Sequence, residues 1–264
     1  MRNTRIAQSA LIAFWPLTAL VLYCDAQPIA RLVPGGQELS NLIAFLYLSI
    51  LISQMRPSRR LLAVLFVPLS AIGEAIFTLV FGLYHYRLNA IPLYVPLGHS
   101  ILLSVGLSYA DRSLWRVHKR TLQQALLLFH ALLIGGTLLL FHDILSALLL
   151  AVFLIVLWQS RSRSRTTYLV IGGLVLYIEL LGTMWGCWRW EPFAFGVLRT
   201  TNPPLGAFAC YVIADIIAVK MAALVGSWCS PLHIPRLTTA PCEVEFEPQL
   251  WRRPEQSQAS SMEL

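Results

Sequence analysis

Three acidic residues, Glu74, Glu179 and Asp215, lie within long stretches of sequence that are otherwise apolar. A charged acid at the centre of a membrane helix costs roughly 2.5 to 3.5 kcal/mol, so such residues normally face a protein interior and serve a function. An acid kept in an apolar environment favours its neutral form, which leaves a proton available for transfer. These positions therefore predict acid catalysis. The structural alternative is that each acid only hydrogen-bonds a neighbouring helix.

Further polar residues lie close to these acids. His99 follows Pro96 by three residues and would approach Glu74 if their helices pack antiparallel, so we predict that it positions or relays a proton. Asp215 is either a further acid or the counter-ion of Lys220. Asp143 falls in a turn and is expected to be solvated. His99 also has a structural alternative, as a buried histidine with satisfied hydrogen bonds.

Aromatic residues gather downstream of both glutamates. Aromatic faces that line a cavity stabilise a carbocation through the ring quadrupole, so we predict a substrate-binding role for them. Their alternative role is an interfacial belt at the membrane surface. The residues are Tyr84, Tyr86, Trp185, Trp188 and Trp190.

The composition is that of an integral membrane protein. The chain of 264 residues is 57% hydrophobic and only 12% charged, with a mean hydropathy of +0.65, whereas soluble domains carry roughly 25% charged residues. The net charge of +7 comes from short basic clusters between apolar runs, which positive-inside topology explains, so we expect no nucleic-acid partner. The five cysteines have no metal-ligand spacing, and we predict no metal site.

Apolar runs of suitable length predict an all-α polytopic bundle of about eight transmembrane helices. The shortest run, 144–158, leaves a re-entrant hairpin or a tight turn open. Basic residues gather in every second loop, which predicts a bacterial plasma membrane protein with cytoplasmic N- and C-termini and with loops 84–92 and 187–203 outside. The predicted spans are 6–24, 38–55, 61–83, 93–110, 121–141, 144–158, 167–186 and 204–226.

The chain divides into a transmembrane domain, residues 1–229, and a polar tail, 230–264, which is expected to be disordered and cytoplasmic. Within the domain, "GLYHY" at 82–86 resembles "GCWRW" at 186–190. A glutamate precedes each motif, by eight residues in the first case and seven in the second, and the tripeptide Pro-Leu-Gly follows each. We therefore predict a parallel 4+4 internal repeat, with halves of about 1–120 and 121–229.

Two segments also resemble a known family. "GLYHY" with the following "IPLYVPLGH", and "GCWRW" with "NPPLG", resemble the integral membrane proteins of carotenoid biosynthesis typified by the bisanhydrobacterioruberin hydratases. The family has a tryptophan where this chain has His99. A more distant likeness, in architecture and in the buried acidic pair, is to the integral-membrane terpene cyclases. The resemblance implies isoprenoid chemistry.

Combining the residues with this resemblance predicts an enzyme that needs no cofactor. An apolar isoprenoid, or another lipid-soluble substrate, would enter from the bilayer and take a proton from Glu74 at a C=C bond. The aromatic residues would stabilise the cation, and Glu179 or Asp215 would complete hydration or cyclisation. The alternatives are a small transporter or proton-coupled carrier that uses the intramembrane carboxylates, and a non-catalytic component of a membrane assembly.

Overall fold

Long helices form at all eight predicted apolar segments. The computed structural model describes residues 4–30, 32 and 35–228, and the predicted tail, 230–264, lies outside them. The all-α prediction is confirmed, and the segment at 144–158 is one continuous helix. The long helices are α1 (Thr4–Cys24), α3 (Gly36–Gln54), α4 (Pro57–Ala75), α5 (Tyr94–Ala110), α7 (Lys119–Phe141), α8 (Ile144–Gln159), α9 (Ser162–Met184) and α10 (Phe208–Trp228).

Five of these helices are long and apolar enough to cross a membrane. They are α1, α3, α7, α9 and the combined helix from Pro57 to Val80. Large apolar side chains also point outward, with Leu79, Leu139 and Trp158 each more than 70% exposed. An extensive exposed apolar surface marks contact with lipid. The helices therefore fit an integral membrane protein.

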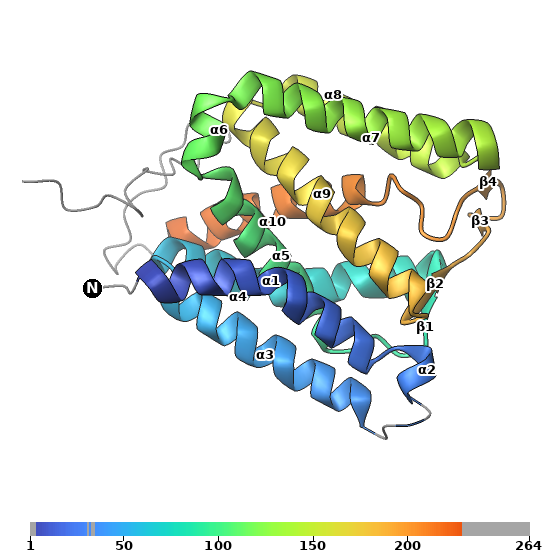
Figure 1. Cartoon of the computed structure of the whole chain (residues 1–264), viewed down its shortest axis with the longest axis horizontal. Coiled ribbons are helices and arrows are strands. Elements are labelled where there is room, and N and C mark those ends of the chain that lie inside the picture. The colour runs from blue at the N-terminus through green and yellow to red at the C-terminus, as the bar shows by residue number, and fades with distance from the viewer. Residues whose placement is uncertain (1–3, 31, 33–34, 229–264) are drawn as a thin grey trace, which may run out of the picture.

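Short elements connect the long helices. α4 continues into a π-helical turn, η1 (Ile76–Val80), and two small helices, α2 (Gln27–Ala30) and α6 (Ser113–Val117), lie in loops. Two antiparallel ribbons, which hydropathy did not predict, join β1 (Tyr84–Tyr86) to β2 (Trp188–Trp190) and β3 (Phe193–Ala194) to β4 (Leu198–Arg199). Both ribbons lie at the same end of the bundle (Figure 1).

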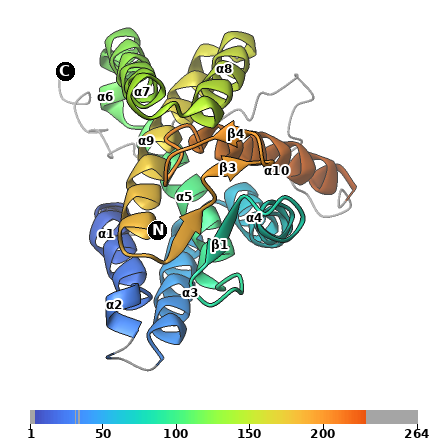
Figure 2. The same ribbon diagram turned by 90° about the vertical axis from the view of Figure 1, so that its right-hand side faces the viewer.

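Helix α5 lies at the centre of the bundle. It packs against α3, α4 and α9, while α10 packs against both α4 and α9. The pair α7 and α8 lies on the far side of α9 from α1 and α3, as the end view shows (Figure 2). At Gly106 of α5, an added Cβ would lie 2.5 Å from Ile171 of α9, so the small residue allows the two helices to approach closely.

Buried aspartates fix two loops at the ribbon end. Asp25, which follows α1, is fully buried, forms an ion pair with Arg87 and accepts a hydrogen bond of 2.7 Å from the Tyr94 hydroxyl. Asp143 caps α8 by accepting from the Ser146 backbone at 3.0 Å, and also accepts from the Thr201 hydroxyl at 2.6 Å. The expectation that Asp143 is solvated is therefore wrong, because the cap and the neighbouring loop enclose it completely.

Candidate functional site

Glu74 lies at the end of α4 and is held by three side chains. It is only 4% exposed. Its Oε2 accepts hydrogen bonds from the hydroxyls of Tyr84, at 2.7 Å, and Tyr86, at 2.5 Å. Its Oε1 lies 2.8 Å from His99 Nε2. The antiparallel packing of α4 and α5 thus brings His99 to Glu74.

Glu179, in the last two turns of α9, has a matching set of partners. It is 3% exposed. Its Oε2 accepts from the indole nitrogens of Trp188, at 3.0 Å, and Trp190, at 3.1 Å. Its Oε1 accepts from the Tyr211 hydroxyl at 2.8 Å. Each glutamate therefore binds two aromatic residues through one oxygen, and a third ring, from α5 or α10, through the other.

The chain leaves both helices in a similar way after each glutamate. Thr78 and Thr183 each donate a 2.7 Å hydrogen bond to the carbonyl of the glutamate one turn earlier. Gly82 and Gly186 then adopt positive φ angles of 58° and 69°, which glycine accepts without a steric penalty. These turns lead directly into β1 and β2, and they direct the two strands so that they pair with each other.

The ribbon of β1 and β2 has local twofold symmetry. Tyr84 pairs with Trp190, His85 with Arg189 and Tyr86 with Trp188. Beyond the strands, Glu191 N donates to Leu83 O and Arg87 N donates to Cys187 O, both at 2.9 Å. The tyrosines and tryptophans are buried on one face, while His85 and Arg189 are exposed on the other. Because side chains alternate between the two faces of a strand, the two tyrosines and the two tryptophans lie on the same face. There they donate four hydrogen bonds to the two glutamates.

Burial keeps the tyrosine donors protonated. Removal from solvent raises the pKa of Tyr84 and of Tyr86 well above the usual value for a phenol, and the nearby Glu74 carboxylate raises it further. Their rings also pack on the facing strand, with ring centroids 4.5 Å apart for Tyr84 and Trp190. Both phenols therefore remain donors to Glu74 across the neutral pH range.

A stacked pair of rings joins the two acids. The His99 and Tyr211 rings lie 4.7 Å apart and are inclined by only 11°. Both indole nitrogens bind Oε2 of Glu179 and can only donate, so a proton on this carboxyl group resides on Oε1, which also accepts from Tyr211. Similarly, the two phenols bind Oε2 of Glu74, so the oxygen that can exchange a proton with His99 is Oε1. The exchangeable positions of both carboxyl groups therefore meet at the His99–Tyr211 stack.

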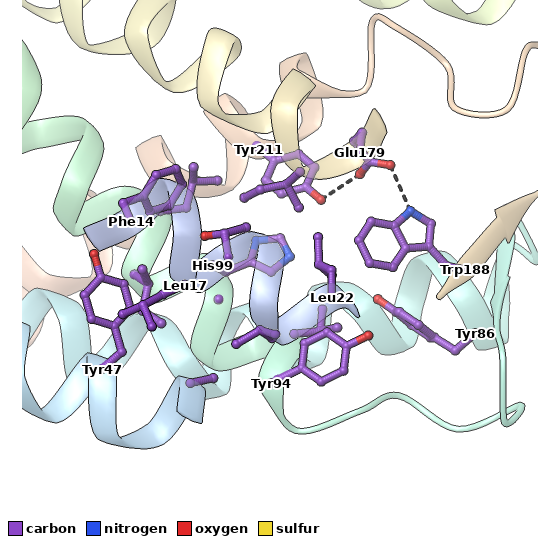
Figure 3. A pocket seen from close by; sticks show the side chains of 18 of the residues that line it. Phe14, Leu17, Leu22, Tyr47, Tyr86, Tyr94, His99, Glu179, Trp188 and Tyr211 are labelled. Carbon is purple, nitrogen blue, oxygen red and sulfur yellow. Dashed lines mark hydrogen bonds between the residues drawn. The ribbon is translucent and has the colours of Figure 1, made fainter. Parts of the chain in front are cut away.

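The stack lines a mostly apolar cavity (Figure 3) with a volume of about 80 Å³, which is partly open to the outside. Glu179 and Trp188 lie near one end, and Phe14 and Tyr47 near the other. Glu74 is not among the lining residues, since Tyr84, Tyr86 and His99 stand before it. An apolar ligand in this cavity would meet Glu179 directly and Glu74 only through its partners.

Some sequence candidates lie elsewhere. Trp185 packs on Tyr23, with ring centroids 5.6 Å apart, and does not line this cavity. Trp190 binds Glu179 from behind the cavity wall. Asp215 is 5% exposed and lies one turn beyond Tyr211, outside the cavity lining. The sequence analysis did not predict Tyr211, whose one signal is a polar aromatic residue within an apolar run.

The described residues contain no cluster of three or more His, Cys, Asp or Glu side chains that could hold a metal ion.

Comparison of the chain with protein-family models, with curated proteins and with solved structures found no significant match. The chemistry of the site is therefore inferred from the two acids and from the cavity that Glu179 lines.

Proposed function

We propose that this chain is an integral membrane enzyme of isoprenoid or carotenoid metabolism, which protonates a C=C bond and completes either hydration or cyclisation. The observation that carries the proposal is the pair of buried glutamates, each bound by three side chains, beside a cavity walled by aromatic rings. Such a cavity accepts an apolar ligand and supplies the ring faces that stabilise a cation.

The geometry supports a revised division of roles. Glu179 lines the cavity and donates its Oε1 proton to the alkene, which forms a C–H bond and a tertiary carbocation. His99, oriented by Glu74, then takes a proton from water as the oxygen adds to the cation, or from carbon after ring closure. Return of this proton from His99 to Glu179 restores both groups, so that hydration adds one water molecule in total and cyclisation is an isomerisation. Glu74 is thus a positioning residue.

We also propose eight membrane spans arranged as two parallel repeats of four. The twofold ribbon and the matched partners of Glu74 and Glu179 support this arrangement. The spacing from glutamate to glycine is eight residues in the first half and seven in the second, and the structure accounts for the extra residue. In η1, Phe81 N bonds Ile76 O, five residues back, and a π turn of this kind accommodates one extra residue.

Expression in carotenoid-producing hosts tests the reaction. Wild-type protein should change the pigment profile, and Glu179→Gln should reduce the new product by roughly 10²- to 10⁴-fold, the usual contribution of a general acid. Glu74→Gln should also lose product, since His99 loses its orienting partner. Glu38→Gln is the matched control, because Glu38 is exposed near the start of α3.

The amount of folded protein is compared by fluorescence-detected size exclusion, so that loss of product is separated from loss of protein. A wild-type profile that matches the empty vector across several isoprenoid backgrounds would refute the proposal. Retained product in Glu179→Gln would refute the assigned proton donor.

A proton-coupled carrier is the second candidate, and Asp215 favours it. This buried acid lies outside the cavity, and its Oδ2 has no hydrogen-bond partner among the described residues. Acids within membrane helices mark the proton relays of pumps and transporters. In proteoliposomes, a carrier would lose pH-driven proton flux in Asp215→Asn, whereas an enzyme would keep its pigment product in that variant.

A further inference from the structure

A second hollow adjoins the β1–β2 ribbon and is lined by residues from both of its faces. It has a volume of about 670 Å³ and is open to the outside. We call it the vestibule. Its walls come from the α2 segment, both strands and the end of α9. Its polar lining includes Gln27, His85, Arg87, Arg189 and Asn202.

The basic side chains that line the vestibule are His85, Arg87 and Arg189, and no carboxylate is among its lining residues. His85 and Arg189 are directly opposed across the ribbon. Arg87 follows His85 by two residues, so it is a diagonal neighbour of Arg189 on the same face, at roughly 7–8 Å between side-chain bases. Two arginines and a histidine thus converge on one space, and such a concentration of basic side chains favours an anion there.

Acidic residues of the chain neutralise only part of this basic charge. Asp25 accepts from Arg87 through two of the three guanidinium nitrogens, Nε and Nη2, and so orients this side chain. Glu191 lies 3.1 Å from His85. Arg189 is exposed and forms no ion pair with any residue that the structure describes. One oriented arginine and one uncompensated arginine therefore face the same space.

The vestibule and the aromatic cavity share two residues. Tyr86 and Trp188 line both spaces, and each donates a hydrogen bond to one of the buried glutamates. These two rings form a wall with apolar space on one side and a polar, basic space on the other. A ligand group in the vestibule would thus lie directly behind the acid site.

We propose that the vestibule binds an oxyanion of the phosphate class, with Arg189 as its principal ligand and Arg87 as a second. Arginine suits this role because its planar fork binds phosphate oxygens through paired N–H groups. Gln27 and Asn202 add amide donors at the rim. The site is independent of the proposed reaction, since it requires only binding at the outer face of the ribbon.

The test uses purified full-length protein in maltoside micelles, with inorganic pyrophosphate as the probe. Pyrophosphate should raise the midpoint of thermal unfolding, and sodium chloride of equal ionic strength should not. Arg189→Gln should weaken binding by roughly tenfold or more, because a charge-assisted contact is lost. Arg199→Gln is the matched control, an exposed arginine of β4 at the same end of the molecule.

A second arm replaces pyrophosphate with phosphatidylglycerol added to the same micelles. Stabilisation by the lipid alone, lost in Arg189→Gln, would identify a lipid headgroup as the source of the phosphate. Stabilisation by pyrophosphate alone would identify a soluble anion. The proposal is overturned if neither compound stabilises the wild type, or if Arg189→Gln and Arg199→Gln bind alike.

Discussion

At the scale of single residues, the two acids differ in what surrounds them. Glu74 is bound by phenols and an imidazole, groups that exchange protons, whereas two of the three partners of Glu179 are indoles, which only donate. The sequence indicated both acids and their aromatic neighbours, because an acid in an apolar run is conspicuous. It could not show that Tyr211 contacts Glu179, because this contact depends on how α10 packs against α9.

The phenols of Tyr84 and Tyr86 predict a loss of stability at alkaline pH. Their pKa is raised in the folded protein, so folding favours the protonated form. Unfolded phenols ionise near pH 10. The stability that these groups provide is therefore complete below about pH 10 and falls as the pH rises further, by at most about 1.4 kcal/mol per pH unit for each phenol.

Thermal unfolding in detergent between pH 8 and about pH 11.5 measures this dependence. Other buried tyrosines also contribute, so the informative quantity is the difference between wild type and the double variant Tyr84→Phe, Tyr86→Phe. The double variant should show a flatter alkaline decline. Equal slopes for the two proteins would contradict the assignment.

At the scale of elements, hydropathy located the helices well, because runs of apolar residues are the direct requirement of a membrane span. It did not locate the ribbons, since strands of two or three residues are too short to show a period of two. The sequence held a single sign of the π turn η1, which is that Glu74 and Gly82 are one residue further apart than Glu179 and Gly186. The two strands acquire their structure only when α4 and α9 bring them together.

Gly182 of α9 is the position where helix and ribbon approach most closely. An added Cβ there would lie 2.0 Å from the Trp188 ring, so Gly182→Ala should displace the indole from Glu179. Overpacking of this kind costs about 1–3 kcal/mol, measured as a lower midpoint of thermal unfolding, and product formation should fall with it.

The control is Gly173→Ala in the same helix, where an added Cβ has nothing within 4 Å. This variant should be neutral or more stable by up to about 1 kcal/mol, because alanine favours the helix. If both variants unfold at the same temperature, Trp188 is not held against α9 as described.

At the scale of the whole molecule, the ribbons lie at one end of the bundle and α6 lies at the other (Figure 1). The proposed orientation assigns the ribbon end to the outside, where Arg87 and Arg189 stand apart from the basic cytoplasmic loops. The charge pattern of the loops supports that orientation, whereas the cavity depends on side chains from α1, α3, α5, α9 and α10 together. No single segment of sequence indicates such a cavity.

Cysteine labelling in whole cells tests this orientation. In a background with the five native cysteines replaced by alanine, Asn89→Cys and Val197→Cys should react with an impermeant maleimide. Leu114→Cys, in α6, should react only after the membrane is permeabilised. All three side chains are exposed. Labelling of Asn89→Cys and Val197→Cys from opposite sides would defeat the eight-span topology.

The pairing of β1 with β2 also bears on how the protein is made. About a hundred residues of chain separate the two strands, so β1 leaves the ribosome long before its partner exists. Until α9 is inserted, the backbone edge of β1 is unpaired. Tyr84 and Tyr86, which bind Glu74, then have no facing strand to pack against. Closure of the ribbon is therefore a late step of biogenesis, and the acid site matures only when the second half of the chain has been threaded into the bilayer.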